Sequence, residues 1–351
     1  MTDTAAPLVE VDGLVVSVRR AGGAVRLVDE VSFSIGRGES YGLVGQSGSG
    51  KSMTAMAMMG LLRRAREMRV TGAVRLAGRD LLGLTSREMS DVRGAEISMV
   101  FQDPMSSLNP AYTVGEQIAE TLRRHRGMSR REARREAVEA LKLVEIPGAE
   151  RRVSAYPHEF SGGMRQRVML AIAVACRPKV LIADEATTAL DVTVQAQVLG
   201  LLRRLQEDLG MAVLFITHDL SVLADIADRV GVMYAGQLVE EASVFDVFER
   251  TSHPYSSALL RSSPEYRGLA GASLLPTSHQ IADTGCRFRP RCGFATGRCE
   301  QDVVLAAVPG ESAHTSRCAR VSEIRIPTGM DLWDELEKGT DDKRSAAGSN
   351  A

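Results

Sequence analysis

An eight-residue segment rich in glycine and serine carries the clearest chemical signal in the chain. It matches the pattern G-x-x-x-x-G-K-[ST] and consists of Gly45, Gln46, Ser47, Gly48, Ser49, Gly50, Lys51 and Ser52. An apolar run at 41–44 precedes it and a helical pattern at 51–62 follows it, as a phosphate-binding loop requires. Backbone N–H groups of such a loop bind phosphate oxygens. We expect Lys51 to bridge the β- and γ-phosphates of a nucleotide and Ser52 to hold Mg²⁺.

Two acidic residues end a second apolar run. Asp184 and Glu185 follow four apolar residues at 180–183. Such a pair can simply cap the next helix, but beside a phosphate loop it predicts the metal-binding half of a nucleotide site. We expect Asp184 to bind the metal through water and Glu185 to orient or deprotonate the attacking water.

Two further polar residues stand at the ends of apolar runs. His218 follows the run at 212–217 and can donate a hydrogen bond to a γ-phosphate, whereas Gln102 follows the run at 97–101 and can contact metal or water. Neither residue is specific alone. Ligands of open α/β sheets bind at the carboxyl ends of the strands, so these residues and the acids are expected to meet there.

A Ser-Gly-Gly segment precedes the apolar run 168–176. Ser161 is in position to cap the helix that starts there, while Gly162 and Gly163 leave the first helical N–H groups open to an anion. Ordinary helix starts look similar, so this segment gains meaning only beside the other motifs.

The elements that must position these residues are predicted from periodicity. Short runs that are apolar on both faces alternate with helical patterns, which predicts an α/β fold with a parallel sheet covered by helices. Between 114 and 143 the pattern is helical only, and Ser129 with Glu132 predicts a capping box. Its arginine-rich part, 123–135, is interpreted as a solvated face, with a surface for acidic partners as the alternative.

Composition excludes several classes of function. The 351 residues carry 43 basic and 44 acidic side chains, so no net field attracts nucleic acid or anionic lipid. Aromatic residues make up 4%, too few for a stacking platform that binds single strands. The longest apolar stretch, 168–176, is too short to span a bilayer, and we find no secretory signal, so we expect a cytosolic protein.

The cysteines are concentrated near the C-terminus. Cys286, Cys292, Cys299 and Cys318 lie in a Pro-rich segment whose spacing fits neither a zinc ribbon nor a bacterial ferredoxin. Free thiols, zinc and an iron–sulfur cluster all remain open from spacing. Cys176 lies in an apolar helix and is expected to be buried.

Taken together, the motifs resemble those of the ATP-binding cassette (ABC) ATPases. The matching residues, in the family's order over roughly 8–262, are the loop at 45–52, Gln102, FSGGMRQR at 160–167, the acids at 184–185, 189–191 and His218. The resemblance implies a P-loop ABC cassette at 1–262, with an antiparallel β subdomain and a helical subdomain at about 103–178. It also implies an extension at 263–330, and the polar tail at 331–351 is expected to be disordered.

The resemblance further implies how the site works. ATP and Mg²⁺ are sandwiched between two subunits, and each subunit contributes a different edge. The residues implied to act in cis are Lys51, Ser52, Gln102, Asp184, Glu185 and His218, and those implied to act in trans are Ser161, Gly162 and Gly163. Two departures stand out: Ala186 replaces the family's proline, and Val18 stands where an aromatic side chain normally stacks on adenine.

Finer stretches resemble the ATPase subunits of oligopeptide and dipeptide importers. They lie at 101–110, 187–199 and 253–260, and those at 50–62 and 182–184 favour the D-type over the F-type subunit. The implied assembly sits peripherally on the cytoplasmic face of the membrane. Its other members are an F-type or identical ATPase, two transmembrane permeases and an extracytoplasmic solute-binding protein. Gln102 and its neighbours are implied to line the groove that receives a permease helix.

The cysteine segment resembles the C-terminal extension of these importers, in some of which four cysteines hold a [4Fe-4S] cluster. This favours the cluster, with zinc as the alternative. The sequence argues against two other functions. A soluble ABC ATPase acting on nucleic acid or ribosomes usually has two cassettes or a long coiled coil, and a monomeric P-loop kinase leaves Ser161–Gly163 and His218 without a role. We therefore predict an importer ATPase with no nucleic-acid partner.

Overall fold

The computed structural model describes residues 6–20, 23–62, 67–101, 107–185, 192–262, 280–311, 313–328 and 331. Several sequence predictions lie outside these residues. They concern Gln102, Ala186, the motif at 189–191 and, apart from Asp331, the tail at 331–351.

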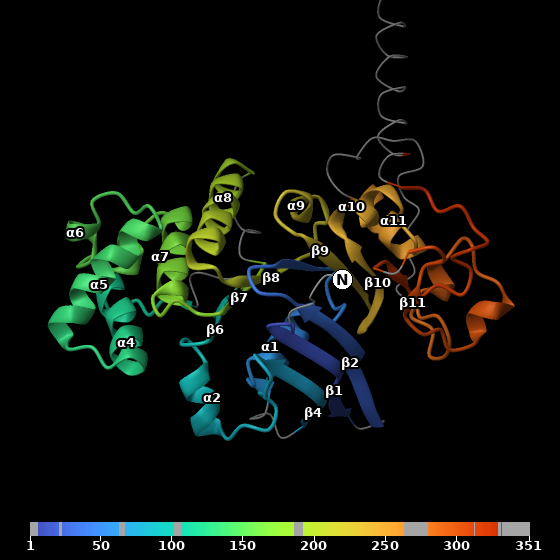
Figure 1. Ribbon diagram of the computed structural model, residues 1–351, viewed down its shortest axis with the longest axis horizontal. Coiled ribbons are helices and arrows are strands. Elements are labelled where there is room, and N and C mark those ends of the chain that lie inside the picture. The colour runs from blue at the N-terminus through green and yellow to red at the C-terminus, as the bar shows by residue number, and fades with distance from the viewer. Residues whose placement is uncertain are drawn as a thin grey trace, which may run out of the picture. The chain divides into compact units, whose positions relative to one another are not determined.

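The described strands form two sheets (Figure 1). The smaller has the order β2-β1-β4-β5, with bounds β1 (Val9–Arg20), β2 (Gly23–Ile35), β4 (Met68–Leu76) and β5 (Arg79–Asp80). The larger has the order β11-β12-β10-β9-β3-β8-β7-β6. Its bounds are β3 (Ser40–Val44), β6 (Ile97–Val100), β7 (Val180–Asp184), β8 (Ala212–Thr217), β9 (Arg229–Tyr234), β10 (Gln237–Ser243), β11 (Ala306–Ala307) and β12 (Thr315–Ser316).

The predicted parallel strands are present. β7 pairs in parallel with both β6 and β8, so that Ala183 lies opposite Val100 and Asp184 opposite Ile216. Every residue of β7 and β8 is buried. This confirms the α/β prediction, because strands buried on both faces need continuous apolar runs. By contrast, β9, β10, β12 and β11 pair antiparallel in that order.

The chain forms two compact units. Unit 1 comprises residues 1–14, 32–41 and 52–216, and unit 2 comprises 15–31, 42–51 and 217–351. Residues on both sides of the predicted domain boundary at 262 belong to unit 2. That boundary therefore stays a prediction.

Unit 1 contains the predicted helical insertion, shown in green in Figure 1. Its helices are α4 (Val114–Arg126), α5 (Arg130–Leu143), α6 (Ala149–Arg152) and α7 (Gly162–Val174). Ser129 and Glu132 form the predicted capping box at the start of α5. The arginine-rich face is mostly solvated: Arg123 pairs with Glu116, and Arg124 with Asp91. Unit 1 also holds α2 (Ser86–Val92) and α8 (Val192–Leu209), and α1 (Lys51–Met58) begins at the boundary of the units.

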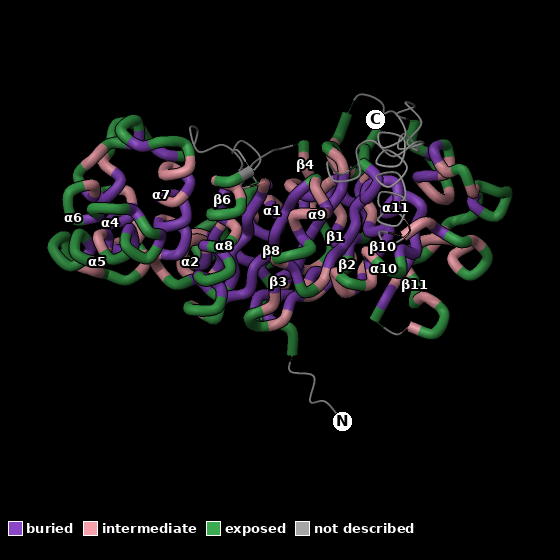
Figure 2. The backbone as a smooth tube through the Cα atoms, turned by 90° about the horizontal axis from the view of Figure 1, so that it is seen from above, coloured by how far each residue is buried: buried purple, intermediate pink, exposed green. Residues whose placement is uncertain are grey.

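Unit 2 contains α9 (Ser221–Ala224), α10 (Val244–Glu249) and α11 (Pro254–Arg261). The C-terminal extension, defined here as residues 280–328, has little regular structure, and Figure 2 shows its tube mostly exposed or intermediate. It joins the sheet through β12, where Ser316 lies opposite Glu240. Within the described ranges, no helix is both long and apolar enough to cross a bilayer.

Candidate functional site

The phosphate loop connects β3 to α1, and its main part lies in unit 2. Two of its glycines are required by close backbone contacts as well as by their positive φ angles. A Cβ at Gly45 (φ 157°) would lie 2.2 Å from the carbonyl oxygen of Met233, and one at Gly50 (φ 107°) would lie 2.8 Å from that of Leu27. Only glycine fits these two places.

Lys51 is folded back onto this loop. Its side chain is 5% exposed, and Nζ donates to the carbonyl oxygens of Gly45 at 2.6 Å and Gln46 at 3.1 Å. Burying an ammonium group without such partners would cost at least roughly several kcal/mol of folding free energy. The Lys51 ammonium group therefore lies within the loop, where its positive charge can attract an anion.

The residues predicted to bind the metal lie in unit 1 where they are described. Ser52 Oγ donates to Asp184 Oδ1 at 3.0 Å, and Asp184 is 6% exposed at the end of β7. Two of the three predicted Mg²⁺ ligands are thus together, and the third, Gln102, lies outside the described residues. A hydroxyl and a carboxylate are oxygen donors of the kind that Mg²⁺ prefers, so the residues fit this metal.

Glu185 occupies a sharp turn directly after β7. Its φ of 47° is left-handed, which is uncommon for a residue with a side chain. Its N–H donates to the carbonyl oxygen of Ile216 at 2.9 Å. This bond fixes the backbone of the predicted general base relative to the end of β8.

His218 follows β8 directly, as predicted, and is exposed in unit 2. Its neighbour Asp219 lies at the start of α9, where Asp219 Oδ1 accepts from Ser221 N at 3.0 Å and from Ser221 Oγ at 2.7 Å.

The Ser-Gly-Gly segment starts α7 in unit 1. Ser161 takes the N-cap position, but its side chain makes no capping hydrogen bond, so that part of the prediction is wrong. The hydroxyl is exposed instead. The two glycines differ: a Cβ at Gly163 would lie 2.7 Å from Val194 Cγ1, whereas one at Gly162 would meet nothing within 4 Å. Packing thus explains Gly163 but not Gly162.

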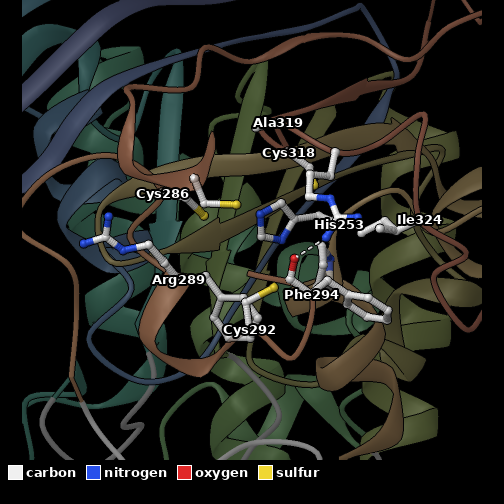
Figure 3. Close-up of a pocket in the computed structure, with 12 residues that line it drawn as sticks. His253, Cys286, Arg289, Cys292, Phe294, Cys318, Ala319 and Ile324 are labelled. Carbon is white, nitrogen blue, oxygen red and sulfur yellow. Dashed lines mark hydrogen bonds between the residues drawn. The ribbon is translucent and has the colours of Figure 1, made fainter. Parts of the chain in front are cut away.

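The four C-terminal cysteines line one cavity in unit 2, together with His253 and Phe288. Figure 3 shows Cys286, Cys292 and Cys318 around His253. All are free thiols. Burial raises the pKa of Cys286 and Cys292, and that of Cys318 to about 11. Across the part of the chain that the structure describes, no three His, Cys, Asp or Glu side chains converge closely enough to hold one metal ion.

Two other predictions concern single side chains. Cys176 is half-buried rather than fully buried, and its Sγ lies 3.8 Å from the carbonyl oxygen of Thr121. Val18, which stands where an adenine-stacking aromatic residue was expected, lies on β1 and is half-buried.

Sequence reasoning missed two residues that contact the phosphate loop. Tyr255 and Arg291 both hydrogen-bond to Gln46, over separations of 209 and 245 residues. Tyr255 belongs to a stretch noted only for its family resemblance, and Arg291 lies between two cysteines. No local pattern announces either contact.

Known proteins match the chain along most of its length. Family models match at 28–188 (ABC transporter) and at 239–299 (oligopeptide/dipeptide transporter, C-terminal region). A peptide import ATP-binding protein of Brucella abortus is 47% identical over 327 residues, which cover 92% of this chain and 96% of the relative. A peptide ABC transporter ATP-binding protein of Sinorhizobium fredii is 48% identical over 306 residues, covering 85% and 90%.

Solved structures agree with these relatives. One is an ATP-binding cassette captured as a dimer in a post-hydrolysis state with ADP and Pi. It has a TM-score of 0.60 and 30% identity, covering 67% of this chain and 98% of that chain. Another is a subunit of an ABC transporter complex from Clostridium perfringens, with a TM-score of 0.59 and 25% identity, covering 70% and 93%.

Proposed function

The chain belongs to the ABC transporter family as an ATP-binding subunit of the peptide import type, and we propose that the residues described above divide the work of ATP binding and hydrolysis. Two contacts carry the assignment. Ser52 donates a hydrogen bond to Asp184, and Lys51, the residue before Ser52, donates to carbonyl groups of the loop. This combination supplies N–H donors and a cation for phosphate, and oxygen ligands for Mg²⁺.

Each residue has a distinct task in the hydrolysis. Lys51 and the loop N–H groups bind the β- and γ-phosphates, and Glu185 orients or deprotonates the attacking water. His218 donates a hydrogen bond to the γ-phosphate. Bound Mg²⁺ neutralises phosphate charge, and Ser52 and Asp184 are the residues that hold it. Gln102, outside the described residues, is proposed to contact metal or water.

A second subunit completes the site. Ser161, Gly162 and Gly163 are proposed to bind the γ-phosphate of the ATP held by the partner. Support comes from the exposed Ser161 hydroxyl, which is not used as a cap, and from the open space around Gly162. The γ-phosphate then binds both subunits, so ATP favours the closed dimer and hydrolysis releases it.

A hollow in unit 1 supports docking to membrane subunits. It measures about 320 Å³, and its lining includes Phe101, Ser107, Met99 and Ile172. Phe101 precedes Gln102 and is 41% exposed, unusual for a large apolar side chain. We propose that this hollow receives a helix from one of two permeases. Such docking would place the chain peripherally on the cytoplasmic face of the membrane. An F-type second ATPase, or a second copy, and an extracytoplasmic solute-binding protein complete the assembly.

The role of Glu185 is tested with Glu185→Gln. The amide keeps the shape of the side chain but cannot accept a proton, so we expect ATP binding to persist while turnover falls by about 10²-fold or more. Glu207→Gln, a change of the same type on the exposed side of α8, is the control and should hydrolyse ATP normally. An ordinary hydrolysis rate in Glu185→Gln would refute the assigned role.

The trans role is tested in the same background. Glu185→Gln should accumulate an ATP-loaded dimer, measured by light scattering with and without an F-type companion. Adding Ser161→Glu places a negative charge where the partner's γ-phosphate is expected. That double variant should still bind ATP but fail to pair, whereas unchanged pairing would contradict the arrangement.

We also propose that Cys286, Cys292, Cys299 and Cys318 hold a [4Fe-4S] cluster, with zinc as the alternative. Support comes from their shared cavity. A single zinc ion needs its donors within about 2.3 Å of one point, whereas a cluster spreads its thiolates over four irons. Thiols with raised pKa values are protonated until a metal displaces the protons.

Metal analysis after anaerobic purification tests this proposal. We expect about four iron and four sulfide ions per chain and a brown colour. Cys318→Ser should lower the iron content, and Cys176→Ser, outside the cavity, should leave it unchanged. A colourless protein loaded with zinc would overturn the cluster.

A further inference from the structure

Gln46 connects the phosphate loop to the C-terminal part of unit 2. Its N–H donates to the hydroxyl of Tyr255 at 2.8 Å, and its side-chain oxygen accepts from Arg291 Nη1 at 3.3 Å. Its carbonyl oxygen accepts from Lys51 Nζ and from the N–H of Ser49, both at 3.1 Å. One residue therefore contacts both the phosphate-binding lysine and the two long-range partners.

Arg291 is buried and held mainly by aromatic rings. Only 9% of it is exposed, and its guanidinium carbon lies 5.9 Å from the ring centre of Tyr234 and 5.8 Å from that of Phe288. Such cation–π contacts fix a guanidinium strongly where water is excluded. Its Nε makes no hydrogen bond among the described atoms. The hydrogen bond to Gln46 is therefore important for pairing the polar atoms of the Arg291 side chain.

Tyr255 is packed into the same aromatic cluster, which consists of Tyr234, Tyr255 and Phe288. The Tyr255 ring centre lies 4.6 Å from that of Tyr234 and 5.5 Å from that of Phe288. Burial raises the pKa of Tyr255, so the hydroxyl stays neutral. The Tyr255 N–H donates to His253 Nδ1 at 3.1 Å, and burial lowers the pKa of His253 to about 3. Both groups keep one protonation state near neutral pH.

The cluster also borders the cysteine cavity. His253 and Phe288 line that cavity. Arg291 lies in a short turn between Cys286 and Cys292, where its N–H donates to the carbonyl oxygen of Phe288 at 2.9 Å. The position of Arg291 therefore depends on how the cysteine segment folds.

A second connection supports the other end of the loop. Arg287, the residue after Cys286, donates to the carbonyl oxygen of Ala235 and to Asp29. The hairpin turn that contains Ala235 continues with Gly236, whose N–H donates to the carbonyl oxygen of Ser49 at 2.8 Å. The extension thus reaches both Gln46 and, through this turn, Ser49.

We propose that Arg291 and Tyr255 are positioning residues for ATP binding, through which the C-terminal extension and α11 set the nucleotide affinity of the phosphate loop. They hold Gln46, and the Gln46 carbonyl oxygen in turn holds Lys51. A loop ordered in advance loses less conformational entropy when the phosphates bind. The inference rests on the proposed binding of ATP by this loop and adds a role for residues far from it in sequence.

The test compares Arg291→Met and Tyr255→Phe in the full-length chain. Tyr255→Phe removes one hydrogen bond, whereas Arg291→Met removes one hydrogen bond together with the cation–π contacts to Tyr234 and Phe288. Both changes keep most of the packing volume. A net hydrogen bond corresponds to about a three- to tenfold change in affinity, so each variant should raise KM for ATP by that factor with kcat changed less than about twofold. Arg298→Met is the matched control, because Arg298 forms an ion pair with Glu323 at the surface, and its KM should not change.

A third variant separates the two contacts. In a Gln46→Ala background the side-chain oxygen is absent, so Arg291→Met should have no further effect on ATP affinity. Tyr255→Phe should keep its effect there, because Tyr255 contacts the backbone N–H. This double-mutant cycle measures coupling through Gln46 directly.

Unchanged KM in both Arg291→Met and Tyr255→Phe would overturn the inference, and so would a loss of kcat alone, since partial unfolding lowers the active fraction without changing KM. If Arg291→Met fails to fold, Tyr255→Phe decides, because it retains the ring. Failure of the unaltered chain to bind ATP in the same assay would instead count against the proposed function.

Discussion

The helical region at 114–174 and the C-terminal extension at 280–328 are stabilised in opposite ways. In the helical region the backbone is satisfied within the helices, apolar residues such as Ile118 and Leu122 are buried, and the charges are mostly at the surface. In the extension, arginine side chains hydrogen-bond to backbone carbonyl groups. Arg317 donates to the carbonyl oxygens of Leu238 and Val303, and Arg320 donates to that of Phe294.

This difference follows from the backbone. An irregular segment pairs fewer of its own N–H and C=O groups than a helix does, so side chains complete the pairing. The two regions should therefore respond differently to loss of a charge. A charge removed from the helical region should matter little, and one removed from beneath the extension should matter greatly.

The largest effect is expected for Glu240→Ala. Glu240 is fully buried on β10 and accepts from the N–H groups of Ser252 at 2.7 Å and His253 at 3.0 Å, while His314 Nε2 lies 2.8 Å away. Removing one member of a buried charged set costs about 3–5 kcal/mol of unfolding free energy. Urea unfolding followed by circular dichroism measures this. Glu249→Ala, exposed on α10, is the control, and equal losses in both would contradict the comparison.

Leu122→Ala should have a slightly smaller effect in the helical region. Leu122 is 1% exposed on α4, and burial losses of this kind cost about 2–5 kcal/mol. The same urea experiment applies. Leu143→Ala, at 38% exposure, provides the reference, and the prediction fails if the exposed leucine proves equally important.

A pH-dependent contribution to stability is expected from His314 in the extension. Burial lowers the pKa of His314, but hydrogen bonds and charges from Glu240 and Glu311 outweigh it and leave the pKa raised. The stabilisation is therefore complete below the ordinary histidine value of about 6.5 and is lost as pH rises through the raised pKa. Arg250, which pairs with Glu311, opposes the negative field around His314, whereas the nearby carboxylate of Asp246 adds to it.

Thermal unfolding measured between about pH 6 and pH 9, where His314 is expected to lose its proton, checks this contribution to stability. The stability difference between the unaltered chain and His314→Gln should shrink as pH rises. A difference that stays constant or grows would show that His314 contributes no charge-dependent stabilisation.

The smallest effect is expected for Arg124→Ala. Arg124 pairs with Asp91 at 2.7 Å, but the two side chains are 52% and 58% exposed. Exposed pairs contribute about 0–1 kcal/mol, so unfolding should barely change. A loss comparable to that of Glu240→Ala would remove the distinction between the two regions.

Local sequence was sufficient wherever neighbouring residues set the geometry. The loop at 45–52, the buried β7 that ends in Asp184, and the capping box of Ser129 were all predicted, because each depends on residues within one turn or strand. The side-chain cap by Ser161 failed. The pattern identified the N-cap position but could not show where the hydroxyl points.

What the sequence by itself determined is therefore a set of candidate groups: a loop of the phosphate-binding pattern, two acids at the end of a buried strand that are predicted to hold a metal and activate water, and a cysteine segment of undecided ligand. The tertiary structure alone decided which distant residues contact the loop. Tyr255 and Arg291 meet Gln46 across more than 200 residues. Such contacts leave no periodic signal in the chain, because they arise only when strands and turns far apart in sequence fold against one another.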